Sequence, residues 1–200
     1  MAATDYSLRA IVEPFLLTLR QQAPNIKVSI RWINEHDLFE QMERGIIDLA
    51  LTTPEASPGD LRAKTLFSET YVCVLRNAHP LLKNDSLTIE QFCSIDHAIV
   101  SYVGGAFEGT TDQVLRSMGK QRRVVLSVPS FLSLVDILKT SDLCAVVPKR
   151  LIKNVQGLTT VKLPFDVPGF TKIMTWHERT HHSDAHRWIR ESIIKLCNEL

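Results

Sequence analysis

The 200-residue chain has little net charge and no long apolar segment. Its formal net charge is +1, so it lacks the basic surface with which proteins hold a nucleic-acid backbone. No apolar run in the sequence approaches the roughly 18 residues that a membrane-spanning helix needs. The opening residues, 1–5, have neither the positive nor the apolar region of a secretory signal peptide. We therefore expect a cytoplasmic domain that binds neither membrane nor, by itself, DNA.

Cysteine is also sparse. The four cysteines form no C-x-x-C pair, so the spacing indicates neither a redox motif nor a zinc site. Cys73 and Cys144 lie inside apolar runs, where a thiol behaves as a small core side chain. Because no secretory context is visible, we expect all four to be reduced. We also expect no cofactor and no bound metal.

A strand–helix–strand pattern lies near the start of the chain. Residues 28–32 alternate between apolar and polar, 38–44 have helical spacing, Gly45 follows as a C-cap, and 46–51 are apolar. Such a unit builds a parallel sheet, and parallel sheets bind small ligands beyond the carboxyl ends of their strands. The pattern therefore predicts an α/β fold with a ligand site at strand ends.

The rest of the chain continues this alternation. A first helix is expected over residues 8–23, with Ser7 as N-cap and Pro14 as a kink. Strands at 61–67 and 70–75 are expected, in a register that could be antiparallel. Further helices are expected at 89–93, 111–118, 131–139 and after 149, and further strands at 98–101, 124–128, 143–147, 158–163 and 173–176. A last helix, capped by Ser183 or Asp184, has as its apolar side Trp188, Ile189, Ile193, Leu196 and Leu200.

Two sets of strands and helices can be separated, one over residues 1–75 and the other over 76–172. Two adjacent α/β units joined by crossing connections imply a hinge with a cleft. This organisation favours a binding protein over a protein with a single closed core.

One motif suggests metal chemistry. Residues 177–181 read H-E-x-x-H, the zinc-peptidase motif, which requires both histidines on one helical face. Here a predicted strand precedes the motif and a helix cap follows it, so His177, Glu178 and His181 fall in a strand end and a loop. We interpret the match as accidental, although a zinc hydrolase remains an alternative.

Two other catalytic patterns are weak. The glycines in residues 104–109 fit neither G-x-G-x-x-G nor a P-loop, and Glu108 and Asp112 would repel a phosphate there. No serine lies in G-x-S-x-G, although a triad is defined by geometry and not by sequence order. The glycine-rich stretch is therefore expected to serve as a turn and helix cap.

Hydroxyl-bearing residues follow several predicted strands. Such positions suit hydrogen bonding to a small polar ligand, anions included. Ser7 and Ser130 could equally cap their own helices. The residues concerned are Thr4, Asp5, Tyr6, Ser7, Thr52, Thr53, Ser101, Tyr102, Ser130, Phe131 and Pro148.

Four segments together resemble one family. In chain order they read FLLTLRQQAPNIKVSIRW, MERGIIDLALTT, LFSETYVCVLRNAHPL and RRVVLSVPSFLSLVDILKTSDLCAVVPKRL. Their order and spacing are similar to those of the effector-binding domain of LysR-type transcriptional regulators. The resemblance implies two Rossmann-like subdomains of the type 2 periplasmic-binding-protein fold, joined by two crossover strands. Subdomain I would comprise 1–75 plus 174–200, and subdomain II 76–173.

The resemblance also implies a function. A small-molecule inducer would bind in the cleft between the subdomains, at the strand-end residues named above, without catalysis. Asp5 would disfavour an anion there. The winged helix-turn-helix of the family is absent from this chain, so DNA would be bound only through that missing N-terminal domain. Ligand binding would alter the geometry of a homodimer or tetramer. The alternative within the same fold is a periplasmic-type solute-binding protein.

Overall fold

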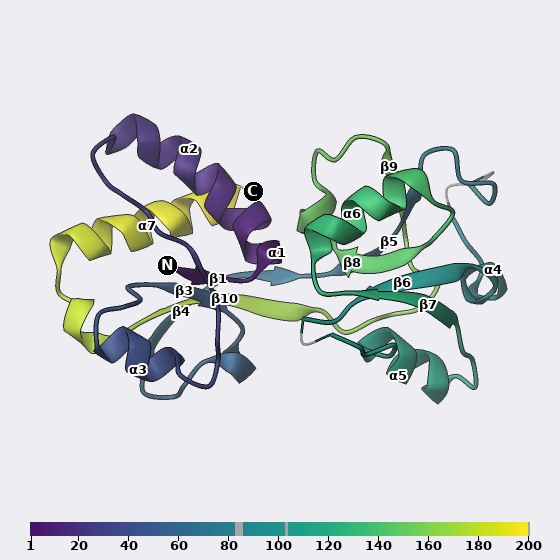
Figure 1. Ribbon diagram of the computed structural model, residues 1–200, viewed down its shortest axis with the longest axis horizontal. Coiled ribbons are helices and arrows are strands. Elements are labelled where there is room, and N and C mark those ends of the chain that lie inside the picture. The colour runs from purple at the N-terminus through teal and green to yellow at the C-terminus, as the bar shows by residue number, and fades with distance from the viewer. Residues whose placement is uncertain (83–85, 103, 200) are drawn as a thin grey trace. The chain divides into compact units, whose positions relative to one another are not determined.

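The computed structural model describes residues 1–82, 86–102 and 104–199. The chain divides into two compact α/β units (Figure 1). Unit 1 comprises Met1–Ser68 and Phe170–Leu200, and unit 2 comprises Glu69–Gly169. The chain thus leaves unit 1 once and returns to it once. The sequence analysis placed the boundaries between the two subdomains at 75/76 and 173/174, and these boundaries remain a prediction.

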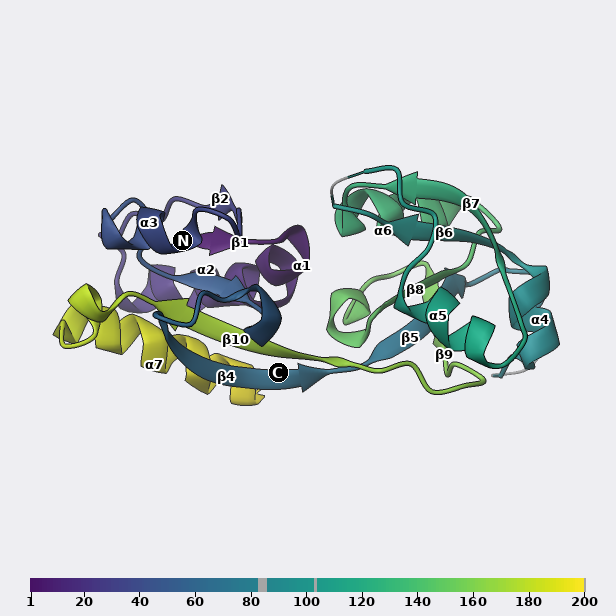
Figure 2. The same cartoon turned by 90° about the horizontal axis from the view of Figure 1, so that it is seen from below.

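Unit 1 contains a five-stranded sheet in the order β2-β1-β3-β10-β4, seen from one face in Figure 2. Strand β1 pairs in parallel with both β2 and β3, and β10 pairs antiparallel with β3. The strands are β1 (Ala2–Ala3), β2 (Arg31–Trp32), β3 (Ala50–Thr52), β4 (Arg62–Glu69) and β10 (Phe170–Trp176). The parallel strands confirm the predicted strand–helix–strand unit.

Helices cover both faces of this sheet. Helices α2 (Glu13–Gln22) and α7 (Asp184–Glu199) lie on one face, and α3 (Leu38–Glu43) lies on the other (Figure 1). Leu38 and Met42 of α3 are fully buried against β1 and β3. Gly45 has a φ of 74°, which confirms the predicted helix end. Leu200 of the expected last helix lies outside the described residues.

The first helix begins earlier than expected. It starts with α1 (Asp5–Ser7), and Thr4, instead of the predicted Ser7, is its N-cap, accepting a hydrogen bond from the Ser7 N–H. A π-helical segment (Leu8–Val12) joins α1 to α2. Pro14 explains this segment, because proline has no N–H to donate and its ring crowds the preceding turn. The helix therefore changes locally to i→i+5 hydrogen bonding instead of ending.

One strand is shorter than expected, and one possible strand pairing does not occur. The strand expected over 28–32 is reduced to Arg31–Trp32, because its sole partner at this edge of the sheet, β1, is two residues long. Trp32, one of the apolar positions in this alternation, is 68% exposed. The strands expected at 61–67 and 70–75 are confirmed, but they do not pair with each other. They form β4 and β5 (Tyr71–Arg76), which follow one another along the chain and enter different sheets.

Unit 2 also consists of strands enclosed by helices. Strands β8 and β9 flank β5, while β6 pairs in parallel with β7, and a bridge between His97 and Cys144 joins β6 to β8. The strands are β6 (Asp96–Val100), β7 (Arg123–Val128), β8 (Ala145–Pro148) and β9 (Leu158–Val161). The helices are α4 (Ile89–Ser94), α5 (Thr110–Ser117) and α6 (Phe131–Thr140), with a 3-10 turn at Lys149–Ile152. These elements match the predicted ones to within a few residues.

The core of unit 2 contains the two cysteines that the sequence assigned to it. Cys73 and Cys144 have no exposed surface, and their Sγ atoms lie 3.1 Å apart as free thiols. Burial raises the pKa of the Cys144 thiol. A buried thiol with a raised pKa is chemically inert, so Cys144 fills space in the core as predicted.

Close backbone approach occurs where the chain leaves and re-enters unit 1. A Cβ atom on Gly169 would lie 2.1 Å from the carbonyl oxygen of Glu69, which no side chain can tolerate. Glycine is therefore required at residue 169. Among the described residues, no helix is long and apolar enough to cross a membrane.

His97 makes folding of unit 2 dependent on pH. Its Nε2–H donates to the Phe92 carbonyl (2.8 Å), and Arg122 donates to its Nδ1 (3.4 Å), which requires the neutral ring. Burial lowers the pKa of His97 from 6.5 to about 4, although the Phe92 carbonyl opposes this shift. Since the folded pKa lies below the unfolded one, the stabilisation is complete above the unfolded pKa and is lost as the pH falls towards 4.

We predict that the free energy of unfolding falls by about 2 kcal/mol between about pH 7 and about pH 5 through His97 alone. Urea titration of the wild type and of His97→Gln measures this contribution, because glutamine keeps an N–H donor and does not titrate. His36→Gln, at an exposed site, is the matched control and should behave as wild type. Equal pH dependence of His97→Gln and wild type would contradict the prediction.

Candidate ligand-binding site

In unit 1, strand register gathers three of the predicted threonines at one edge of the sheet. Ala3 pairs with Leu51, so Thr4 and Thr52 follow at the same level on neighbouring parallel strands. Thr53 directly follows β3. Thr52 is 4% exposed, and Thr53 is half-buried. The structure therefore brings these hydroxyl groups together, as the positions after the strands suggested.

The residues after Thr4 are fixed by local hydrogen bonds. The Thr4 Oγ1 accepts from the Ser7 N–H at 3.2 Å and lies 3.1 Å from the Ser7 Oγ. The Asp5 carboxylate accepts from the Tyr6 N–H at 2.7 Å. Tyr6 is buried and packs edge-on against Phe170, with ring centroids 5.7 Å apart. Asp5 and Ser7 are also buried, so this turn is a rigid, polar corner.

Sequence analysis missed Lys172 at this edge. Ile173 pairs with Thr52, which places Lys172 level with Thr53. The Lys172 side chain is 3% exposed, and its Nζ lies 5.8 Å from the centre of the Tyr6 ring. A sequence feature does mark it: alternation along β10 places Lys172 on the same face as Phe170, Met174 and Trp176, which are all apolar.

In unit 2, a second group of predicted residues meets at the ends of parallel strands. Val100 pairs with Val128, and the Ser101 N–H donates to the Val128 carbonyl at 2.9 Å, so Ser101 lies beside the turn that opens α6. The parallel bridge from β6 to β8 places Pro148, at the carboxyl end of β8, at the same edge. Ser101 and Pro148 are buried.

Two aromatic residues and a helix cap complete this edge. Tyr102 and Phe131 pack edge-on with ring centroids 5.9 Å apart, and Tyr102 is 53% exposed. The Ser130 Oγ accepts from the N–H groups of Leu132 and Ser133 at 3.2 and 3.3 Å. Ser130 therefore caps α6, which was one of its two expected roles, and its oxygen remains half-buried at the strand end.

The glycine-rich stretch acts as a turn and cap, as expected. Gly104 and Gly105 have φ values of 81° and 78°, which side chains rarely permit. The Gly109 N–H donates to the Asp112 carboxylate, which also forms two 2.8 Å hydrogen bonds with Arg122. Burial acts to raise the pKa of Asp112, but the Arg122 hydrogen bonds outweigh it and the pKa is lowered. This carboxylate is unsuited to holding phosphate.

The H-E-x-x-H residues do not lie on one helical face. Glu178–Thr180 is a 3-10 turn capped by His177, whose Nδ1 accepts from the Arg179 N–H. Glu178 pairs with Arg62 at 2.5 Å, and the His181 Nδ1 accepts from the Trp176 indole at 3.3 Å. No group of acidic, histidine and cysteine side chains suited to a metal occurs in the described part of the chain. The interpretation of this motif as accidental fits these contacts.

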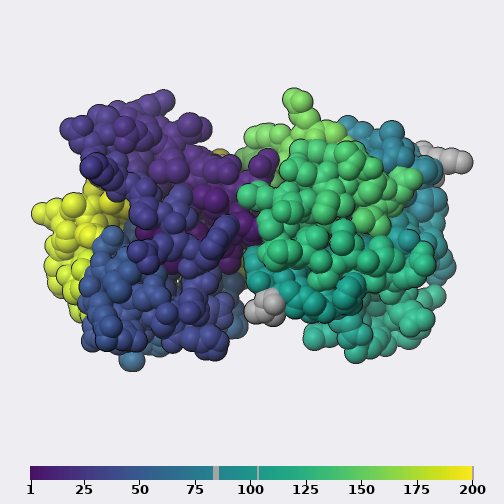
Figure 3. All heavy atoms as spheres, viewed as in Figure 1, coloured from purple at the N-terminus to yellow at the C-terminus, as the bar shows by residue number. Residues whose placement is uncertain are grey.

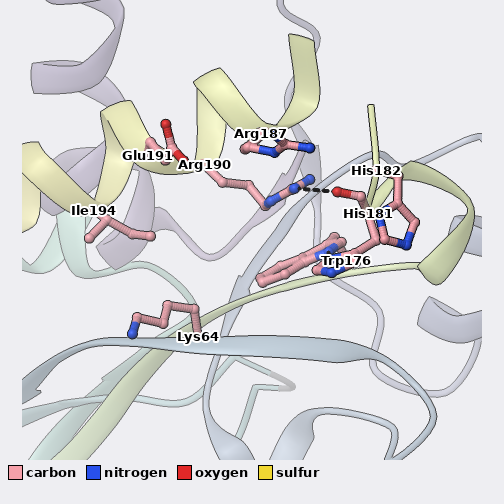
Figure 4. A pocket seen from close by; sticks show the side chains of 8 residues that line it. All are labelled: Lys64, Trp176, His181, His182, Arg187, Arg190, Glu191 and Ile194. Carbon is pink, nitrogen blue, oxygen red and sulfur yellow. Dashed lines mark hydrogen bonds between the residues drawn. The ribbon is translucent and has the colours of Figure 1, made fainter. Parts of the chain in front are cut away.

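The same segment borders a shallow cavity of about 260 Å³ within unit 1. Figure 4 shows side chains of α7 facing those of β4 and the end of β10. Arg190 stacks over Trp176 at 4.7 Å and donates to the carbonyls of Thr180 and His181. The cavity is lined by Lys64, Trp176, His181, His182, Arg187, Arg190, Glu191 and Ile194. Because Arg190 is bound by the backbone, it stabilises the turn and is not aimed at a ligand.

Two α/β units whose parallel strands end in hydroxyl-bearing loops are typical of proteins that bind small molecules. Residues 1–198 match the family described as the LysR substrate binding domain. The chain belongs to this family, which consists of transcriptional regulators and not of enzymes. The resemblance predicted from four sequence segments is confirmed.

Named relatives agree with this assignment. The chain is 32% identical over 203 residues to the HTH-type transcriptional activator NagR of Ralstonia sp, covering 100% of this chain and 66% of NagR. It is 30% identical over 203 residues to the activator NahR of Pseudomonas putida, covering 100% of this chain and 67% of NahR. The chain therefore spans about two thirds of the length of these regulators.

Solved structures confirm the predicted fold class. The regulatory domain of MexT, a transcriptional activator in Pseudomonas aeruginosa, superposes with a TM-score of 0.82 at 27% identity. The match covers 97% of this chain and 96% of the MexT chain. The two units thus form the periplasmic-binding-protein-like fold of LysR regulatory domains.

The cap of α6 provides a test of the unit 2 edge. Replacing Ser130 by alanine removes the acceptor for two N–H groups and should lower the free energy of unfolding by about 1 kcal/mol. Ser133→Ala, at an exposed position of the same helix, is the control and should cost less. Denaturant titration of both variants measures the difference, and equal values would show that Ser130 does not cap the helix in solution.

Proposed function

We propose that this chain senses a small-molecule inducer and that the polar strand ends of the two units bind it. The observation that carries the proposal is the strand register, which gathers hydroxyl groups at the carboxyl ends of β1 and β3 in one unit and of β6 and β7 in the other. The proposed contacts are Thr4, Asp5, Tyr6, Ser7, Thr52 and Thr53, together with Ser101, Tyr102, Ser130, Phe131 and Pro148. Membership of a family of inducer-responsive regulators supports it.

In the whole regulator, the inducer would act by population shift. A ligand that binds one conformation more tightly than another increases the population of that conformation. The size of the shift is limited by the difference in affinity. We infer that the change is passed to a DNA-binding domain outside this chain, through a homodimer or tetramer in the cytoplasm. Leu17 of α2 and Trp32 of β2 are 72% and 68% exposed. Figure 3 shows α2 at the molecular surface. Exposed apolar side chains such as these would suit contact with another copy.

The binding residues can be tested with a panel of small metabolites. A compound that raises the melting temperature of the chain is then titrated calorimetrically against Thr52→Val and Ser101→Ala. Each variant removes one hydroxyl group, so we expect about 3- to 10-fold weaker binding to each. Ser117→Ala, exposed on α5, is the control and should bind as wild type.

The regulatory role requires a test with the full-length protein. We expect a binding metabolite to change the DNA footprint or the sedimentation of the full-length regulator, with the effect weakened in Thr52→Val. If no metabolite across a broad panel changes either property, the sensing function is wrong. If both variants bind an active metabolite as tightly as the wild type does, the sensing function stands but the binding site lies elsewhere.

A further inference from the structure

We propose that unit 1 has a second small-molecule site, the cavity between α7 and β4, and that it takes a phosphate monoester with a small apolar group. Figure 4 shows Arg190 and Ile194 of α7 facing Lys64 of β4 and Trp176 of β10 across this cavity. All the lining residues belong to unit 1. The inference does not rest on the proposed function.

This cavity lies away from the polar strand ends. Strand β10 runs antiparallel to β3, with Ile173 level with Thr52 and Thr175 level with Ala50. Trp176 therefore lies beyond the amino end of β3, whereas Thr52 is at its carboxyl end. A ligand in the cavity would occupy the opposite end of the strands from the hydroxyl groups described above.

The first argument is the charge of the cavity. Its lining includes the cations Lys64, Arg187 and Arg190 but one acid, Glu191, which leaves an excess of two positive charges when the histidines are neutral. Arg187 pairs with Asp184 at 3.5 Å, but the Asp184 side chain is 94% exposed, and such a pair contributes little. In the described part of the chain, the exposed Lys64 forms no ion pair. A doubly charged phosphate group would balance this excess.

The second argument is the burial of Arg190, which is 5% exposed. Its guanidinium group donates to the carbonyls of Thr180 and His181 at 3.2 and 2.8 Å and lies 4.7 Å from the centre of the Trp176 ring. No carboxylate of the described residues forms an ion pair with it. The carbonyls hold this cation in place without neutralising it. Arg190 therefore contributes positive potential to the cavity, even though its hydrogen bonds are used by the turn.

Glu191 offsets only part of this charge. Burial and the like charge of Arg187 lower the pKa of Arg190, while Glu191 acts to raise it, and the net shift is downward. Glu191 is itself exposed, so water screens its attraction for the neighbouring cations. An anion that enters the cavity would meet net attraction, and Glu191 would oppose its binding.

The third argument is the shape of the cavity. The Trp176 ring, the Ile194 side chain and the methylene groups of Lys64 supply apolar surface beside the cations. Trp176 is fixed, because it is 7% exposed and its indole N–H donates to the His181 Nδ1 at 3.3 Å. The volume of about 260 Å³ lies below the range of roughly 300–1,000 Å³ typical of drug-sized ligands. The site thus suits a small ester with one apolar group.

The fluorescence of Trp176 provides a direct test. The chain has three tryptophans, so replacing Trp32 and Trp188 by phenylalanine leaves Trp176 as the single emitter. Phenyl phosphate is titrated into this variant at about pH 8, where its phosphate is a dianion. We expect a saturable change in emission. Benzoate, which has the ring but one charge, and inorganic phosphate, which has no ring, should each bind at least about 3-fold more weakly.

Charge variants in this single-tryptophan background identify the residues that act on the ligand. Lys64→Met and Arg187→Met should each weaken binding of phenyl phosphate about 3- to 5-fold, the modest effect of an exposed charge pair. Glu191→Gln should strengthen binding about 2- to 3-fold, a gain that a purely structural residue would not give. Lys27→Met, exposed elsewhere on unit 1, is the matched control and should bind as the parent. All four positions are exposed, so these variants should fold.

Several results would overturn the inference. They are the lack of a saturable signal up to about 10 mM phenyl phosphate, tighter binding of benzoate, or unchanged affinity in both Lys64→Met and Arg187→Met. Weaker binding in Thr52→Val but not in those two variants would place the ligand at the strand ends and would also contradict it. Because Trp176 reports on this cavity and Thr52→Val on the strand ends, either proposal can fail while the other stands.

Discussion

The candidate site depends on parallel pairing of short strands. Because the carboxyl ends of parallel strands meet at one edge, Thr4 comes to lie beside Thr52, and Ser101 beside the turn at Ser130. These residues are far apart in sequence, and none of their side chains alone distinguishes a binding group from a helix cap. Antiparallel β10 then adds Lys172 from the far end of the chain. The proposed ligand contacts therefore depend on strand register before they depend on any particular side chain.

Local sequence patterns predicted most elements but not their pairing. The helix at 38–44 was predictable because its apolar spacing stops just before Gly45. The helix at 131–139 was predictable because its apolar spacing begins just after Ser130. The strand at 28–32 was overestimated because alternation reports which side chains prefer burial, whereas strand length is set by the partner, here Ala2–Ala3. Likewise an antiparallel pairing of β4 with β5 was left open, since sequence does not show that consecutive strands enter different sheets.

The limits at the site have a similar origin. Hydroxyl groups after predicted strands could be found by position alone, and the structure places them at two strand edges. The role of Thr4 as N-cap was assigned to Ser7, because the apolar helical spacing begins at Leu8 and a π-helical segment was not foreseen. Lys172 was passed over because one lysine in an alternating strand usually faces water. Its apolar neighbours on the same face were the available sign that it does not.

Lys172 also shows why stability alone does not explain this edge of the sheet. Burial holds its pKa near 8, below its ordinary value of 10.5. The unfolded chain therefore binds the proton more readily, and between these two values stability rises with pH. At neutral pH the lysine thus weakens the fold, although the Tyr6 ring offsets part of the cost. A methionine of similar length would remove that cost. The position of this charged group beside the hydroxyl groups is therefore not explained by the stability of unit 1.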